Sequence, residues 1–204
     1  MTYAAVTTES IALFPVNLKI SWLTDEQFER LCAENPELRI ELTAQGELIV
    51  LPPAGSETGW SDSEINAALN LWSKQDRTGL TFGSSAGFAL PNGAKRSPEA
   101  SWVKRERWSA LAKEQRRGFA PLCPDFVIEL RSPTDSLPVL QAKMQEYLEN
   151  GAQLGWLLDP LERRVYVYQP GQPVIMLDDP ETLSGDPVLP SFALAVRELW
   201  EPPE

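Results

Sequence analysis

Between residues 125 and 158 the chain holds an apolar strand, an amphipathic helix and a second apolar strand in succession. Asp125–Leu130 (DFVIEL) is a short apolar run typical of a buried strand. Leu137–Asn150 follows with apolar residues at helical spacing, and Gly151 is placed to end that helix. Leu154–Leu158 then returns to the composition of a strand. Because helices alternate with strands here, the sequence predicts a mixed α/β (α+β) fold with a central mixed sheet flanked by helices.

The remaining segments add more strands than helices to this centre. We expect helices after the N-cap residue Thr24, at Ser61–Lys74 and at Glu106–Glu114. We expect strands at Leu38–Leu42, Glu47–Leu51, Ala100–Val103, Val165–Tyr168 and Val174–Leu177, and one or two more within Thr81–Leu90. With 204 residues and no long linker, we expect one domain over residues 21–180. Residues 1–20 are predicted to form an N-terminal arm, and the acidic, Pro-rich residues 181–204 a segment that packs on the domain or forms a tail.

The composition excludes several classes of chemistry. The chain has no histidine, which excludes Ser-His-Asp and Cys-His catalysis and histidine-ligated zinc. Cys32 and Cys123 form neither a metal-binding cluster nor a dense disulfide framework, so a reducing, cytoplasmic setting is expected. No apolar run approaches the ~20 residues that cross a bilayer, so no membrane partner is expected. Any chemistry must therefore use carboxylates, Lys, Arg, Tyr, Ser or a hard metal ion.

The charge of the chain is strongly acidic but unevenly distributed. The net charge of −11 is unusual for a nucleic-acid-binding protein. Residues 95–117, however, contain eight lysines and arginines against three glutamates. This segment is either a solvated helix face or a local patch that faces phosphates. On the second interpretation, the residues that would contact nucleic acid include Lys95, Arg96, Lys104 and Arg105.

A carboxylate within the most apolar strand is the first candidate for a functional site. Side chains alternate along a strand, so Asp125, Val127, Glu129 and Arg131 share one face. A buried carboxylate is costly unless a cation or hydrogen-bond donors meet it. Glu129 is therefore either a partner of Arg131 or Lys143 in an ion pair, or a ligand of a divalent cation, which prefers oxygen ligands.

Three further side chains complete the candidate set. Lys143 borders the apolar stripe of the helix Leu137–Asn150, from which its ammonium could either reach Glu129 or extend into solvent. Glu99 enters the strand Ala100–Val103 after a proline, and Glu64 lies at the edge of the buried face of its helix. Each acid alone is more often a surface residue than a ligand.

At this point the sequence resembles the Uma family of bacterial restriction-endonuclease-like proteins. The stretches that carry the resemblance are residues 97–103 (SPEASWV), 123–133 (CPDFVIELRSP), 143–147 (KMQEY), 150–151 (NG), 155–160 (GWLLDP) and 165–168 (VYVY). The resemblance covers roughly residues 20 to 180 and implies the PD-(D/E)XK nuclease fold, the restriction-endonuclease-like fold.

The resemblance also implies roles for individual residues. The two strand acids of the family fall on Glu99 and Glu129, the helical acid on Glu64, and the displaced lysine on Lys143. This chain departs from the family pattern twice. It has Glu99 where the family usually has aspartate, and Arg131 two residues after Glu129, where the motif would place its lysine.

The resemblance implies that the protein is a Mg²⁺- or Mn²⁺-dependent DNA endonuclease that works as a homodimer. Glu99 and Glu129 would hold the metal with the carbonyl of Leu130, Lys143 would assist with Arg131 as its helper, and Glu64 would support either the metal or the lysine. Two other functions stay open: a nuclease-fold module that has lost catalysis and serves binding or assembly, and a hydrolase of RNA or nucleotides.

Overall fold

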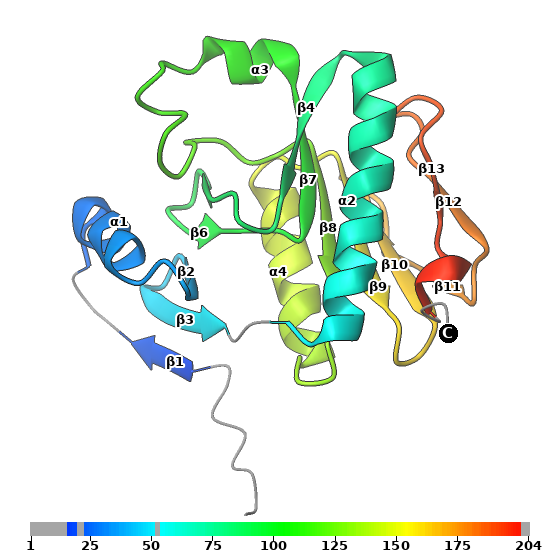
Figure 1. Ribbon diagram of the computed structural model, residues 1–204, viewed down its shortest axis with the longest axis horizontal. Coiled ribbons are helices and arrows are strands. Elements are labelled where there is room, and N and C mark those ends of the chain that lie inside the picture. Colours follow the sequence, from blue (N-terminus) through cyan, green and yellow to red (C-terminus); the bar gives the residue numbers. More distant parts are fainter. Residues whose placement is uncertain (1–15, 20–22, 52–53, 201–204) are drawn as a thin grey trace, which may run out of the picture.

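The structure, a computed structural model, describes residues 16–19, 23–51 and 54–200 (Figure 1). Its centre is a six-stranded sheet in the order β11-β10-β9-β8-β7-β4. The bounds of these strands are β4 Gly79–Gly83, β7 Ala100–Lys104, β8 Phe126–Leu130, β9 Leu154–Asp159, β10 Arg164–Tyr168 and β11 Ile175–Asp178. The β8–β9 pair is parallel and the others are antiparallel, which confirms the predicted mixed sheet.

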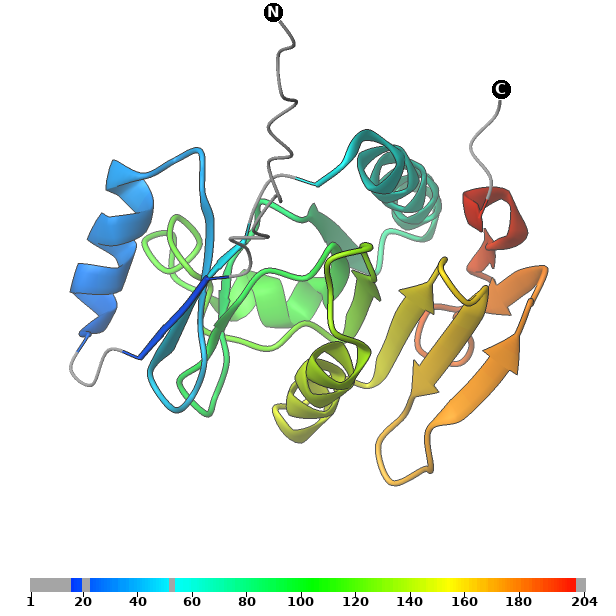
Figure 2. The ribbon, with the colours of Figure 1, turned by 90° about the horizontal axis from the view of Figure 1, so that it is seen from below.

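Two helices cover opposite faces of this sheet (Figure 2). Helix α2 (Ser56–Asp76) packs through Ile65 and Leu69 against the face that carries Ile128 and Trp156. Helix α4 (Leu137–Glu149) packs on the other face, against side chains such as Val127, Leu157 and Tyr166. Because the sheet is buried on both sides, both of its faces carry apolar side chains, which alternate along each strand.

A second sheet lies beside the first and includes the two strands predicted at Leu38–Leu42 and Glu47–Leu51. Its order is β1-β3-β2-β6-β5, with β1 Val16–Lys19, β2 Arg39–Leu42, β3 Glu47–Leu51, β5 Phe88–Ala89 and β6 Lys95–Arg96. Helix α1 (Asp25–Glu34) packs on it through Phe28 and begins at Thr24, which forms the capping box with Gln27. Of the arm predicted over residues 1–20, only β1 lies within the described residues.

The described part of the C-terminal segment packs against the core. Strands β12 (Thr182–Ser184) and β13 (Ala193–Ala195) form a hairpin, and helix α5 (Arg197–Trp200) follows. Leu183, Phe192 and Trp200 join the core on the α2 side of the sheet.

Two predicted elements differ in extent from the observed ones. The helix predicted at Glu106–Glu114 is α3, which spans only Arg105–Ala110. It stops because Leu111 has an extended backbone, and because the guanidinium of Arg116 donates to the carbonyls of Ser109 and Leu111. Helix α2 begins five residues earlier than Ser61, directly after Gly55.

Candidate active site

Glu129 lies near the end of β8 and faces helix α4. Its side chain is buried, and its Oε1 is 2.8 Å from the Nζ of Lys143. The hydroxyl of Tyr147, one turn further along α4, donates to the same oxygen at 3.0 Å. Of the two partners that the sequence allowed for Glu129, the structure therefore brings Lys143 and not Arg131.

Glu41 of strand β2 shares the same lysine. The Nζ of Lys143 is 2.9 Å from Glu41 Oε1, so the ammonium lies between two buried carboxylates from different sheets. Glu41 also accepts a hydrogen bond from the backbone N–H of Ser97 and pairs with Arg96 at 3.0 Å. Four elements of the chain thus meet at one buried cluster of charges.

Glu99 approaches the same place from the neighbouring strand. The β7–β8 ladder pairs Ala100 with Ile128, which puts Glu99 next to Glu129 at the end of that ladder. The Oε1 of Glu99 accepts from Arg39 of β2 at 2.9 Å. Glu99 and Glu129 both line one cleft, so the two predicted strand acids lie together although thirty positions separate them along the chain.

Burial and neighbouring charges shift the pKa values of the side chains in this cluster. Burial raises the pKa of Glu129 to about 7, with Glu41 and Glu99 adding to the rise and Lys143 opposing it. Glu41 is equally buried, but Lys143 and Arg96 lower its pKa to about 2. Burial alone would lower the pKa of Lys143, yet the two carboxylates raise it. Lys143 therefore stays charged at neutral pH, and Glu129 is a carboxyl of this cluster whose pKa lies near neutral pH.

The cleft that these residues line is large and acidic. It has a volume of about 1350 Å³ and runs between the N-terminal sheet and the first turns of α4. Eight carboxylates line it against three cations: the acids are Glu41, Glu47, Glu57, Glu99, Glu129, Asp135, Glu146 and Glu149, and the cations are Arg39, Arg96 and Lys143. All three cations already form ion pairs with carboxylates of the cleft.

Glu129 and Glu99 each have one carboxylate oxygen without a partner from the described part of the chain. Glu129 uses Oε1 for Lys143 and Tyr147, and Glu99 uses Oε1 for Arg39, whereas no described residue donates to Oε2 of either. Neither Oε2 is fully buried, so both reach the cleft. A hard divalent cation prefers oxygen ligands such as these, but the described residues contain no group of three or more Asp, Glu, His or Cys side chains that could hold a metal ion.

Two predicted site residues lie elsewhere. Glu64 is exposed on α2, whereas Asp62 on the same helix is half-buried and lies close to Arg39 and Glu99. Two residues turn a helix by about 200°, so Glu64 points away from the face that carries Asp62. Arg131 pairs with the buried Asp159 at 2.8 Å and is not among the described residues that line the cleft.

The residues predicted to contact nucleic acid do not form one surface. Lys95 is buried against Asp25 at 3.1 Å, and Arg96 is buried between Glu41 and Glu146. Lys104 and Arg105 are exposed, but they lie at the end of β7 opposite Glu99, which the five residues of the strand place roughly 16 Å away. Figure 1 shows α3 at the end of the sheet opposite the first turn of α2.

Sequence reasoning missed Glu41, Arg39 and Asp62. Arg39 and Glu41 alternate with apolar residues in a short strand, a pattern that normally puts the polar side chains in water. Only the approach of α4 and β6 buries this face. Asp62 precedes the apolar positions of α2 by three residues, which was a usable signal, because that spacing puts it beside Ile65 on the helix.

Comparison with known proteins shows the family and the fold of the chain. Among solved structures, the chain is similar to "a putative nuclease belonging to DUF820 from Anabaena variabilis", with 24% identity and a TM-score of 0.66 over 79% of this chain and 89% of that one. No curated protein matches the chain significantly. The sequence pattern of the Uma2 family, described as "Putative restriction endonuclease", matches residues 25–197. Since that match extends from α1 to the start of α5, the chain belongs to the Uma2 family and has its restriction-endonuclease-like fold.

Proposed function

We propose that this protein is a metal-dependent nuclease that hydrolyses phosphodiester bonds in DNA. The observation that carries the proposal is the ion pair of Glu129 and Lys143 at 2.8 Å beside Glu99, at the base of a cleft, in a chain of the Uma2 family. A carboxylate pair with an adjacent lysine is an arrangement that can hold a divalent cation and stabilise charge on a phosphate.

Glu99 and Glu129 are the residues that would hold Mg²⁺ or Mn²⁺, through the Oε2 atoms that face the cleft. When bound, the cation would supply Lewis acidity, both to activate water and to neutralise charge on the phosphate. Lys143 would donate to a phosphate oxygen or orient the attacking water, and Glu41 would hold its ammonium in place. Tyr147 would fix the carboxylate of Glu129 through Oε1 and leave the other oxygen free.

The charge of the site also supports a divalent cation. Five linked carboxylates, namely Glu41, Asp62, Glu99, Glu129 and Glu146, face three cations, namely Arg39, Arg96 and Lys143. Two negative charges remain if all of these groups are ionised. Burial is the main cause of the raised pKa of Glu129, and the neighbouring carboxylates Glu41 and Glu99 add to it. A divalent cation would neutralise the excess negative charge.

The test is cleavage of plasmid and oligonucleotide DNA with Mg²⁺ or Mn²⁺ and with EDTA. We expect cleavage only with metal, and a loss of at least about a hundredfold in Glu129→Gln, because the amide cannot replace a carboxylate ligand. Glu114→Gln is the matched control, since Glu114 is exposed in the loop after α3. Metal-dependent cleavage that survives Glu129→Gln would refute the assignment of the site.

A second candidate function is a binding module without catalysis. The observation that favours it is the pairing of Glu41, Glu99 and Glu129 with cations of the chain itself, which stabilises the cluster without a metal. Isothermal calorimetry distinguishes the two functions. Binding of Mn²⁺ that is lost in Glu99→Gln and Glu129→Gln supports the nuclease, and no binding at millimolar Mn²⁺ supports the module.

A further inference from the structure

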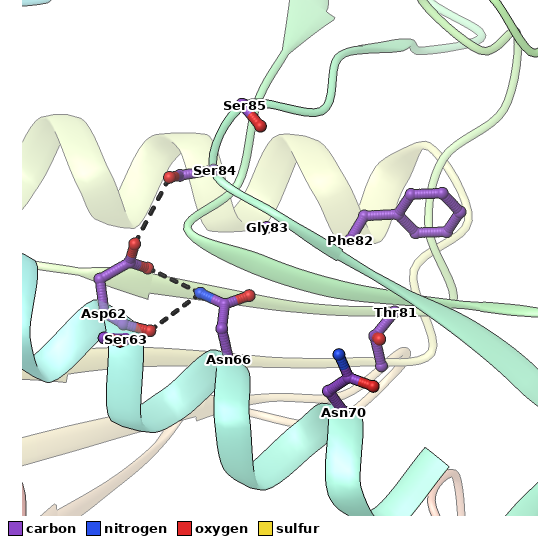
Figure 3. Close-up of a pocket in the computed structure, with 9 residues that line it drawn as sticks. All are labelled: Asp62, Ser63, Asn66, Asn70, Thr81, Phe82, Gly83, Ser84 and Ser85. Carbon is purple, nitrogen blue, oxygen red and sulfur yellow. Dashed lines mark hydrogen bonds between the residues drawn. The ribbon is translucent and has the colours of Figure 1, made fainter. Parts of the chain in front are cut away.

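A second, smaller pocket lies beside the candidate metal site, between helix α2 and the end of strand β4 (Figure 3). Its volume is about 420 Å³. Asp62, Asn66 and Asn70 line it from α2 at a spacing of four residues, so they follow one another along one face of the helix. Thr81 and the turn after β4, including Ser85, form the opposite wall. We call this pocket the α2–β4 groove.

One end of the groove is connected to the site through Asn66. The side-chain amide of Asn66 donates to the backbone carbonyl of Glu99 at 3.1 Å and to Asp62 Oδ1 at 2.9 Å. Asp62 in turn lies close enough to Arg39 for the guanidinium to lower its pKa against the larger rise caused by burial. A molecule in the groove would therefore lie directly beside the residue proposed as a metal ligand.

The chemistry of the groove selects the uncharged part of a substrate. None of the described lysines or arginines lines it, and Asp62 adds a negative charge, so a phosphate group is disfavoured there. Asn70 and the hydroxyls of Thr81 and Ser85 have no hydrogen-bond partner among the described residues, and they offer both donors and acceptors. Base edges and sugar hydroxyls are the parts of a nucleic acid that such groups recognise.

The size of the groove restricts the substrate further. A pocket of about 420 Å³ is in the range of small-molecule sites, roughly 300–1,000 Å³, and is too small for a stacked duplex. Enzymes that hold a single base in a pocket act on single strands or take the nucleotide out of the stack.

We infer that the α2–β4 groove binds one unpaired nucleoside next to the scissile phosphate, so that this nuclease prefers single-stranded or locally unpaired nucleic acid. The inference rests on the proposed nuclease function for the position of the cut, but the groove itself can be tested without catalysis. The acidic surface agrees with it, because single strands depend less than duplex DNA on neutralisation of phosphates.

Asn70→Ala is the variant that tests the groove. Asn70 is exposed and no described residue hydrogen-bonds to it, so its removal leaves the packing of α2 intact. Gln75→Ala is the matched control, since it removes an exposed amide from the same helix on a different face.

The first experiment titrates the ¹⁵N-labelled full chain with deoxynucleosides and ribonucleosides, which carry no phosphate and need no metal. We expect shifts of the side-chain amides of Asn66 and Asn70 and of the backbone at Ser84–Ser85, with affinity reduced about fivefold in Asn70→Ala, the effect of one hydrogen bond. A stronger response to one sugar identifies DNA or RNA as the source of the nucleoside. If no nucleoside shifts these resonances, the inference is overturned.

The second experiment compares cleavage of a single strand and of its duplex in Mn²⁺. We expect faster cleavage of the single strand, and a KM raised about fivefold in Asn70→Ala with kcat nearly unchanged. Cleavage confined to the duplex, or unaffected by Asn70→Ala, would overturn the inference and leave the nuclease standing. Nucleoside binding without cleavage of any substrate would instead overturn the nuclease and keep the groove as a base-binding site.

Discussion

At the scale of single residues, the fold shifts the pKa of Glu129 far enough to affect the pH dependence of stability. Its pKa of about 7 in the folded protein lies above the ordinary value of 4.5, so the folded state binds this proton more tightly than the unfolded state. That contribution to stability is complete below pH 4.5 and is lost as the pH rises through 7. We expect the free energy of unfolding to fall by on the order of 3 kcal/mol between pH 4.5 and pH 8 from this group alone.

Urea denaturation at pH 5 and pH 8 measures this effect. Glu129→Gln should flatten the decline, because the amide does not titrate, whereas Glu114→Gln should keep it. An equally steep decline in Glu129→Gln would show that another group causes it. The pKa of Glu41 is lowered instead of raised, so this group reduces the free energy of unfolding only as the pH falls from 4.5 towards 2.

Single residues also show where sequence reasoning succeeded and where it stopped. Glu129 stood out because a carboxylate in an apolar strand requires a partner, and Lys143 because it borders an apolar helical stripe that packs on that strand. The same reasoning could not find Glu41, whose alternating strand looks like a surface strand. Its role depends on contacts with Lys143 and Arg96, which lie 102 and 55 positions away.

Among the elements, the hairpin β12–β13 makes the least expected contribution to the core. Phe192, in the turn before β13, stacks on Trp156 with ring centroids 5.8 Å apart and also contacts Trp72 at 5.5 Å. The side chain is 2% exposed. We expect Phe192→Ala to destabilise the protein by about 3–5 kcal/mol, since it removes a large ring from an aromatic cluster.

Thermal and urea denaturation of purified variants check this prediction. The control is Met176→Ala on the edge strand β11, where the side chain is 53% exposed and the loss should stay within about 0.5 kcal/mol. A comparably small effect in Phe192→Ala would mean that the C-terminal hairpin does not stabilise the sheet.

The elements differ in how far local sequence determined them. Strand β8, helix α4 and strand β9 follow from hydrophobic periodicity, because each is long enough to show its own period and each packs on the next. Strands β5 and β6 have two residues each and exist only as pairs with their neighbours, so no local pattern could identify them. The prolines and acids of the C-terminal segment hid its hairpin, so the sequence left open whether residues 181–204 pack on the domain or form a tail.

At the scale of the whole molecule, the candidate site is also the junction of the two sheets. Strands of the N-terminal sheet supply Arg39, Glu41 and Arg96, and the elements of the central sheet supply the residues with which they pair. Buried ion pairs add little net stability when intact, but loss of one partner leaves an uncompensated charge. The site and the packing of the sheets therefore depend on the same contacts.

The overall charge is consistent with this arrangement. The net charge of −11 arises partly from a cleft in which carboxylates outnumber cations, and the basic residues 95–117 are mostly occupied within the fold or placed at the far end of the sheet. None of the described helices is long and apolar enough to span a membrane. We therefore expect a cation that neutralises the cleft to change the stability of the whole molecule.

That property predicts a metal-dependent stability that varies with pH. Mn²⁺ at a hundred times its dissociation constant should raise the free energy of unfolding by about 2.7 kcal/mol at pH 8, where Glu129 is ionised. Below pH 7 the metal must displace the proton of Glu129, so its affinity should fall about tenfold for each pH unit. At the same Mn²⁺ concentration, the stabilisation at pH 6 should therefore be about 1.4 kcal/mol smaller.

Denaturation with and without Mn²⁺ at both pH values measures this difference. Glu99→Gln and Glu129→Gln should each remove the stabilisation, and Glu114→Gln should retain it. Equal stabilisation at pH 6 and pH 8 would mean that the metal binds groups other than Glu129. Because this measurement needs neither substrate nor turnover, it tests the carboxylate pair as a cation site independently of any cleavage assay.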